Sequence, residues 1–222
     1  MAGKEKMNPP HLLIAGTPDQ TQNYVDAFTA LGACCHNLPC RTAAGYDALI
    51  LPGGGDIDPT LFSAENQGSR SIDPILDRLQ LRLLFSFLEK GLPVLGICKG
   101  MQMINICFGG GIIQDLPTRQ QHEYIGRDQI HSSRTQKGSF LHSLYGENFP
   151  VNSAHHQGIS EPGRDLRIIQ SAPDGVAEAI SHTSLPVLGV QWHPERMCFS
   201  HRRPDTPDGS LLLTHFLSLC RD

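Results

Sequence analysis

The 222-residue sequence has no apolar run long enough for a membrane-spanning helix. It also lacks an excess of basic residues, because its 18 Lys and Arg are outnumbered by 22 Asp and Glu. With a net charge of −4, the composition gives no reason to expect a nucleic-acid partner. Residues 1–10 contain charges but neither the apolar segment nor the cleavage site of a secretion signal, so we expect a flexible leader and a cytoplasmic protein.

The seven cysteines do not follow the pattern of a disulfide framework. Their number is odd and their spacing is irregular, which favours reduced thiols. Cys35, His36 and Cys40 could be imagined as metal ligands, but no second pair of such residues follows at the spacing of a zinc motif. We therefore expect no metal site.

The first half of the chain alternates between short apolar segments and segments with helical spacing. Strands are predicted at His11–Gly16, Tyr46–Leu51 and Pro93–Ile97. Helices are predicted at Thr17–Leu31, Asp73–Lys90 and Met101–Phe108. This alternation predicts an α/β fold with a doubly wound, mostly parallel sheet flanked by helices. Such a sheet binds its ligands at the carboxyl edge of the strands.

The pattern changes after Asp115. The segment Gln129–Thr135 is polar, and a short helix is predicted near Ser139–Tyr145. Strand-like runs and a terminal helix complete the chain, at Leu166–Ser171, Val176–Ser181, Val187–Trp192 and Leu211–Leu219. We expect some of these strands to be antiparallel and to form a small addition to the sheet. Because no repeat and no long linker divides the chain, residues 11–222 are predicted to form a single domain.

Cys98 stands where the third predicted strand turns into a helix, within Gly96-Ile97-Cys98-Lys99-Gly100. Glycines at both second neighbours are typical of a nucleophile elbow, in which small residues relieve crowding at a strained turn. A sulfur at a helix N-terminus is favoured as the thiolate, and the Lys99 amide would point at an oxyanion formed beside it. The alternative is a buried cysteine that acts as a small apolar residue, which is what we expect of Cys107.

His193 and Glu195 could supply the base and its orienting carboxylate. They follow an apolar strand in Trp192-His193-Pro194-Glu195. Residues two apart in an extended segment lie on the same face, so Glu195 can reach one imidazole nitrogen while the other faces the thiol. Alternatively, His193 is a histidine that is satisfied at a strand end and Glu195 is a solvated charge. The two motifs together favour a Cys98, His193 and Glu195 triad.

The stretches Gly96–Gln102 and Gly189–Glu195 resemble the two signatures of class I glutamine amidotransferases, and they occur in the expected order. Leu51–Pro59 and Val151–Gln157 are similar to the γ-glutamyl-γ-aminobutyrate hydrolase branch of that family. The resemblance implies a flavodoxin-like sheet and cleavage of a small γ-glutamyl amide through a γ-glutamyl thioester. It also implies that no metal and no organic cofactor takes part.

The resemblance further implies roles for single residues. Gly54 would supply a second oxyanion amide beside that of Lys99, although it could instead only form a turn. Gln102 would contact the amino-acid end of the glutamyl group, although it could instead cap a helix. Ser153 would also contact the substrate, and backbone near Gln157 would contact the amino-acid end. His155 and His156 would line the pocket, although this pair could instead be structural.

Two positions depart from the hydrolase branch. Lys99 stands where Arg is more frequent, and we expect little consequence because mainly its amide is needed. Phe62 stands where Tyr is more frequent, which removes a hydroxyl next to Asp56–Pro59 and leaves the leaving-group side of the substrate open. Two other functions share the same residues. One is a glutaminase subunit that passes ammonia to a separate synthetase partner, and the other is a non-catalytic binding or regulatory protein. The sequence also leaves a homodimer open.

Overall fold

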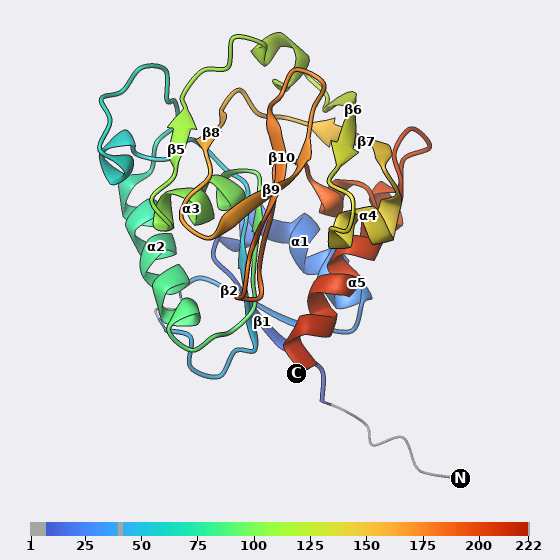
Figure 1. The fold of residues 1–222 in the computed structure, drawn as a ribbon. Helices are drawn as coiled ribbons and strands as arrows, with labels where there is room; N and C mark the ends of the chain where they lie inside the picture. Colours follow the sequence, from blue (N-terminus) through green and yellow to red (C-terminus); the bar gives the residue numbers. More distant parts are fainter. Residues whose placement is uncertain (1–7, 40–41, 222) are drawn as a thin grey trace.

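The computed structural model describes residues 8–39 and 42–221 (Figure 1). Most of the expected leader and Cys40 lie outside the described residues. The strands are β1 (His11–Ile14), β2 (Cys34–Asn37), β3 (Ala48–Leu51), β4 (Val94–Ile97), β5 (Gly111–Ile113), β6 (Gln129–Thr135), β7 (Asn148–Ser153), β8 (Gly158–Glu161), β9 (Leu166–Ser171), β10 (Ala177–His182) and β11 (Val187–Val190). The α-helices are α1 (Pro18–Ala30), α2 (Pro74–Leu88), α3 (Lys99–Cys107), α4 (Phe140–Tyr145) and α5 (Ser210–Ser218).

The main sheet has the strand order β2-β1-β3-β4-β11-β10-β9-β6-β7 among the described residues. The five strands from β2 to β11 are parallel, and the remaining neighbours pair antiparallel. Strands β5 and β8 form a separate antiparallel pair. The parallel half and the antiparallel addition are therefore both present as predicted.

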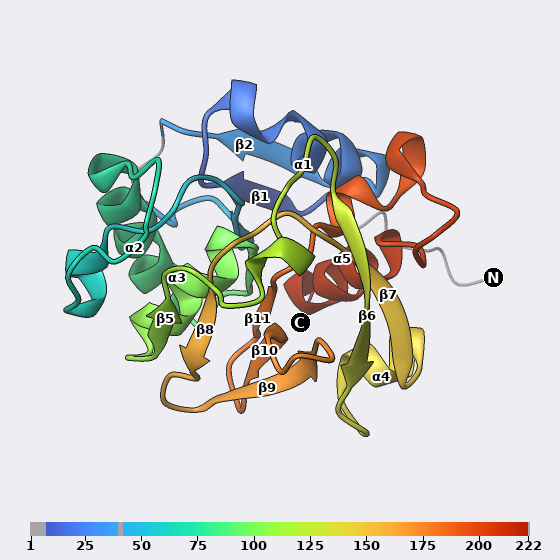
Figure 2. The same cartoon turned by 90° about the horizontal axis from the view of Figure 1, so that it is seen from above.

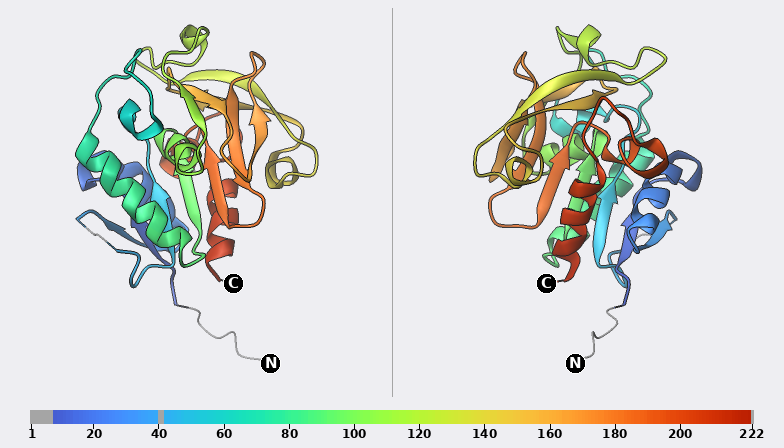
Figure 3. Two further views of the ribbon diagram at one scale, coloured as in Figure 1. Left: turned by 60° about the vertical axis from the view of Figure 1, so that its left-hand side comes forward. Right: turned by 90° about the vertical axis from the view of Figure 1, so that its right-hand side faces the viewer.

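Helices cover both faces of the parallel half. Alternate residues of β1 point to opposite sides, because Leu12 belongs to a core with α1 and α5 while Leu13 belongs to a core with α2 and α3. Figure 3 shows α2 and α5 on opposite sides of the sheet. Two apolar layers thus hold the central strands in place, and their carboxyl ends carry the predicted site residues.

Several strands, most of them polar, were not predicted from the sequence. The segment Gln129–Thr135 forms β6, and β2, β5, β7 and β8 were likewise missed. Six registered residue pairs join β6 to β7, whereas β6 pairs with β9 only at Arg134–Ser171 and Thr135–Gln170. The β6–β7 ribbon therefore extends away from the rest of the sheet, as the view from above shows (Figure 2). Among the described residues, no helix is both long and apolar enough to cross a membrane.

Candidate active site

Cys98 occupies a strained turn between β4 and α3. Its backbone has φ 53° and ψ −109°, a conformation that few residues with side chains adopt. The Cys98 amide donates a hydrogen bond of 2.8 Å to the carbonyl of Val190, at the end of β11. The turn is therefore fixed to the neighbouring strand, and the predicted elbow geometry is present.

The two glycines of the elbow are required by close backbone approaches. A Cβ atom at Gly100 would lie 2.0 Å from the carbonyl oxygen of Leu51, and one at Gly96 would lie 2.4 Å from the backbone of Gly100. Because these contacts are with backbone atoms, no side-chain rotation could relieve them. The glycine spacing thus packs α3 tightly against β3 and β4.

His193 and Glu195 lie beside the elbow. His193 precedes the short 3-10 helix η3 (Pro194–Arg196), and its Nδ1 lies 2.8 Å from Oε1 of Glu195. The imidazole is also close enough to Cys98 for that side chain to raise its pKa. A Cβ atom at Gly53 would lie 2.9 Å from Cε1 of His193 and 3.5 Å from Cβ of Cys98, so both side chains face the same glycine. The structure brings the predicted triad together, and its catalytic role remains a prediction.

The buried ion pair raises the pKa of His193. Burial alone would lower this pKa, but the Glu195 carboxylate and the Cys98 side chain raise it to about 9. Burial likewise opposes ionisation of Glu195, but the nearby His193 and Arg196 lower the pKa of that carboxyl. The Glu195 carboxylate therefore favours the protonated imidazole beside the sulfur.

The predicted oxyanion residues lie together at one small pocket. Gly54 and Lys99 line a volume of about 90 Å³ that also includes Cys98. A Cβ atom at Gly54 would lie 3.6 Å from Cδ of Lys99, so the two residues are adjacent. The Lys99 side chain does not serve this pocket, because its Nζ forms a buried ion pair of 2.6 Å with Oδ1 of Asp77 on α2. The oxyanion role of the Lys99 amide stays a prediction.

Most predicted substrate contacts line the same pocket, namely Gln102, His155, His156 and Gln157. The Gln102 amide donates a 3.1 Å hydrogen bond to the side-chain oxygen of Gln191. His156 is held on both sides, with Nε2 2.9 Å from Asp56 and Nδ1 3.1 Å from Asp115. Rigid side chains thus surround the space next to Cys98.

Ser153 lies elsewhere. It is fully buried, it is not among the residues that line this pocket, and its hydroxyl donates a hydrogen bond of 3.0 Å to the carbonyl of His122. The structure therefore gives Ser153 a role behind the pocket, and the predicted direct substrate contact finds no support in its placement.

Sequence reasoning missed residues that position the triad. Asn152 on β7 accepts a 2.9 Å hydrogen bond from the His193 amide and donates one of 3.1 Å to the His193 carbonyl. The hydroxyl of Tyr24 on α1 accepts a 2.9 Å hydrogen bond from the amide of Gly53. Asn152 could have been suspected because it lies in the Val151–Gln157 stretch, whereas nothing in the sequence around Tyr24 connects it to the site.

A second group of titratable side chains lies behind His155. His122, His131 and Glu178 approach it, so that one donor atom from each of the four residues lies within 4.8 Å of the others. Burial raises the pKa of Glu178 well above its usual value and lowers that of His155 to about 3. Sequence reasoning did not find this cluster, because its members are widely and irregularly spaced along the chain.

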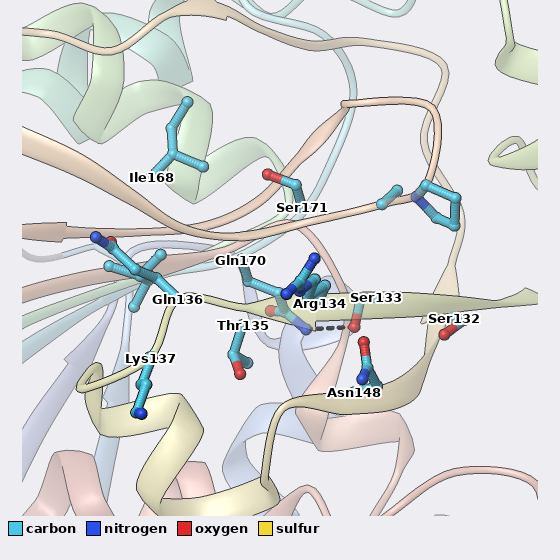
Figure 4. A pocket seen from close by; sticks show the side chains of 13 residues that line it. Ser132, Ser133, Arg134, Thr135, Gln136, Lys137, Asn148, Ile168, Gln170 and Ser171 are labelled. Carbon is cyan, nitrogen blue, oxygen red and sulfur yellow. Dashed lines mark hydrogen bonds between the residues drawn. The ribbon is translucent and has the colours of Figure 1, made fainter.

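A larger hollow of about 740 Å³ is separate from the pocket beside Cys98, and Figure 4 shows the side chains that line it. Strands β6 and β9 line it where they separate, and none of the predicted site residues is part of its wall. Gln170 spans its base by donating a 2.6 Å hydrogen bond to the Ser133 hydroxyl. Because this hollow is an open groove without the elbow cysteine, its size does not make it the better candidate for the reaction.

Comparisons with known proteins find similar sequences and similar structures. Residues 23–195 match the family model of peptidase C26. A glutamine amidotransferase-like protein of Lactococcus lactis is 36% identical over 188 residues, which are 78% of this chain and 79% of that protein. The γ-glutamyl-γ-aminobutyrate hydrolase of Escherichia coli K12 is 33% identical over 168 residues, which are 67% of this chain and 64% of that enzyme.

Solved structures support the fold. A Thermoplasma acidophilum protein described as a GMP synthase subunit superposes with a TM-score of 0.72 at 17% identity, covering 97% of this chain and 96% of the other. A Thermotoga maritima glutamine amidotransferase gives a TM-score of 0.63 at 16% identity, covering 85% and 77%. These similarities confirm the predicted doubly wound α/β architecture.

Proposed function

Because the chain belongs to the peptidase C26 family of class I glutamine amidotransferase-like proteins, and is thus a hydrolase of amide bonds, we propose that it cleaves a small γ-glutamyl amide through a thioester on Cys98. γ-Glutamyl-γ-aminobutyrate is the proposed type of substrate, because a relative that covers two thirds of this chain carries the name of that activity.

The proposed reaction has two steps. The thiolate of Cys98 attacks the γ-carbonyl carbon, the amides of Gly54 and Lys99 hold the oxyanion, and the C–N bond breaks as protonated His193 gives its proton to the departing amine. Water then attacks the thioester while His193 accepts its proton, the C–S bond breaks, and glutamate is released. No metal or organic cofactor enters either step.

The observation that carries this proposal is that Cys98 and His193 face the same glycine, Gly53, while Nδ1 of His193 lies 2.8 Å from Oε1 of Glu195. With a pKa of about 9, His193 is protonated at neutral pH and can supply the proton that the leaving amine needs. The small pocket beside Cys98, with Gln102 and His156 in its wall, supports a compact amino-acid group over a large acyl chain.

The test is incubation of the purified protein with a panel of γ-glutamyl amides that includes glutamine and γ-glutamyl-γ-aminobutyrate. Mass spectrometry would follow both released glutamate and a glutamyl adduct on the protein. We expect turnover of at least one amide and an adduct on the peptide that contains Cys98. Turnover without any adduct, even after rapid acid quenching, would contradict the thioester.

A pair of cysteine variants provides the matched control. Cys98→Ala should abolish turnover, whereas Cys107→Ala should retain it. Burial raises the pKa of Cys107 to about 11, so its thiol is protonated and unreactive at neutral pH. Full hydrolysis by Cys98→Ala would show that the nucleophile is assigned wrongly.

A glutaminase subunit that supplies ammonia to a separate synthetase is the second candidate, since relatives at similar identity are described as glutamine amidotransferases. The same panel distinguishes the two. An independent hydrolase would act alone on a γ-glutamyl amide other than glutamine. A subunit would act on glutamine, and would do so slowly until its partner is added. A non-catalytic binding protein would turn over none of the amides.

A further inference from the structure

Three imidazoles surround one buried carboxylate oxygen behind the proposed active site. Oε1 of Glu178 lies 3.3 Å from Nε2 of His131, 3.8 Å from Nδ1 of His122 and 3.9 Å from Nε2 of His155. Nε2 of His131, Nε2 of His155 and both oxygens of Glu178 are buried without a hydrogen-bond partner among the described residues. An unpartnered buried carboxylate is costly, so this centre requires a positive charge or a proton.

The outer nitrogen of each imidazole is already engaged. Nε2 of His122 faces Oδ2 of Asp174 at 2.9 Å. Nδ1 of His131 lies 3.1 Å from the Ser132 carbonyl, and Nδ1 of His155 lies 2.8 Å from the Gln157 carbonyl. Because these acceptors require an N–H, they direct each lone pair to the inner nitrogen, which faces Glu178. Histidines that bind metals show this arrangement of outer hydrogen bonds.

We propose that His122, His131, His155 and Glu178 bind a Zn²⁺ ion. Three imidazole nitrogens and one carboxylate oxygen suit zinc, whereas Mg²⁺ and Ca²⁺ favour all-oxygen sites. Tetrahedral zinc with bonds of about 2.0 to 2.1 Å has ligand atoms roughly 3.4 Å apart. The three distances from Glu178 are 3.3 to 3.9 Å, and all four ligand atoms lie within 4.8 Å of one another, so side-chain rotations that bring the imidazoles closer together would close the site. This inference departs from the sequence-based expectation of no metal.

The ion would be structural. With four protein ligands it has no open position for water or substrate. Its ligands come from four separate segments: His122 follows the 3-10 helix η2 (Arg119–Gln121), His131 lies on β6, His155 follows β7 and Glu178 lies on β10. Since β6 pairs with β9 at only two positions, the ion would fix the β6–β7 ribbon to the sheet. It would also hold the His155–Gln157 wall of the pocket.

The test measures metal binding in the Cys98→Ala protein, which removes the thiol of the proposed nucleophile as a competing ligand. After chelator treatment and dialysis, Zn²⁺ is added in a calorimetric titration, and Co²⁺ is added in a parallel sample for absorption spectroscopy. We expect one equivalent of bound Zn²⁺. We also expect intense Co²⁺ ligand-field bands typical of four-coordinate sites, without thiolate charge-transfer absorption. Activity plays no part in this measurement, so its outcome is independent of the proposed reaction.

Variants in the same background locate the ion. Glu178→Gln keeps the shape of the side chain but removes its charge, and should weaken Zn²⁺ binding by about 100-fold or more, since even outer partners contribute roughly 10- to 100-fold. Asp174→Asn weakens the outer hydrogen bond to His122 and should reduce affinity by about 10-fold or more. His201→Gln, which changes an exposed histidine elsewhere, should leave binding unchanged.

The proposal is wrong if the Cys98→Ala protein binds no stoichiometric Zn²⁺, or if Glu178→Gln binds it as tightly as the parent. Should Glu178→Gln fail to fold, the Co²⁺ spectrum of the parent protein decides. Weak bands of a six-coordinate ion would overturn the site, and intense four-coordinate bands would support it.

Discussion

At the residue scale, the Glu195 carboxylate next to His193 stabilises the protonated imidazole that the proposed reaction needs. We expect Glu195→Gln to lower kcat by about 100-fold, in the range of a misplaced acid or base, with little change in KM. The variant amide would still reach Nδ1 of His193 but could no longer stabilise the imidazolium. Steady-state kinetics on the substrate identified above would measure both constants.

Glu161→Gln is the control for this prediction, because Glu161 is an exposed carboxylate at the end of β8. It should have the kinetics of the parent protein. An unchanged kcat in Glu195→Gln would mean that the carboxylate has no part in charging or orienting His193.

The triad residues could be predicted because each lies in a short local pattern. Cys98 is framed by glycines within five residues, and His193 precedes Glu195 by two positions. Glu178 and His131 could not be predicted. They lie on β10 and β6, which are not neighbours in the sheet, and only the folded chain brings Nε2 of His131 to 3.3 Å from Glu178. Local spacing contains no information about such a contact.

At the scale of elements, the packing of α3 against β3 determines whether the elbow forms. Gly100→Ala would place a methyl group 2.0 Å from the carbonyl oxygen of Leu51, and the backbone would have to shift. We expect a loss of about 3 kcal/mol or more in the free energy of unfolding, at the upper end of overpacking effects. Urea unfolding followed by circular dichroism would measure it.

Gly158→Ala is the matched comparison, because its Cβ would meet only side-chain atoms, the nearest being Cδ2 of Leu116 at 3.2 Å. A terminal methyl of leucine can move, so this variant should be clearly less destabilised. Equal losses at the two positions would show that backbone approach at Gly100 is not the limiting contact.

The ion pair between Lys99 and Asp77 joins the first residue of α3 to α2. Replacing Lys99 by Met would leave the Asp77 carboxylate buried with only the 2.8 Å hydrogen bond from the Asp58 amide. We expect a loss of about 3 to 5 kcal/mol in the free energy of unfolding, as for other broken buried pairs. The double variant Lys99→Met with Asp77→Asn should recover part of this loss. No recovery in a thermal or chemical unfolding cycle would contradict the coupling.

Polar strands were the elements that sequence patterns could not locate. The residues of β6, Gln129–Thr135, include only one large apolar side chain, and the strand is stabilised by six registered pairs with β7. By contrast, β3, β4 and β11 are buried throughout, so their apolar runs identified them. A hydrophobic period in the sequence arises where one face of an element is buried. The β6–β7 ribbon buries too few apolar side chains to produce such a period.

At the scale of the whole molecule, the proposed catalytic centre is built where the two core layers meet the carboxyl ends of β4 and β11. Alternation of strands and helices predicted this arrangement, since right-handed crossovers place successive helices on both faces. Packing on each face then forces Cys98 and His193 to one edge. The fold therefore constrains the site more strongly than the separate motifs do.

The free energy of unfolding should depend on pH through the charges of His193 and Glu195. The folded-state pKa of His193, about 9, lies above the reference value of 6.5, so its contribution is complete below pH 6.5 and is lost as pH rises through 9. The folded-state pKa of Glu195 lies below its reference value of 4.5, so its contribution is present above pH 4.5 and is lost as pH falls through the lowered value.

The difference in unfolding free energy between the parent and Glu195→Gln should therefore be largest near pH 4.5 to 6.5. Above that range it should narrow by at most about 1.4 kcal/mol per pH unit. Chemical denaturation across a pH series would measure the difference, and a gap that widens towards pH 9 would show that the imidazolium is not stabilised in the folded protein.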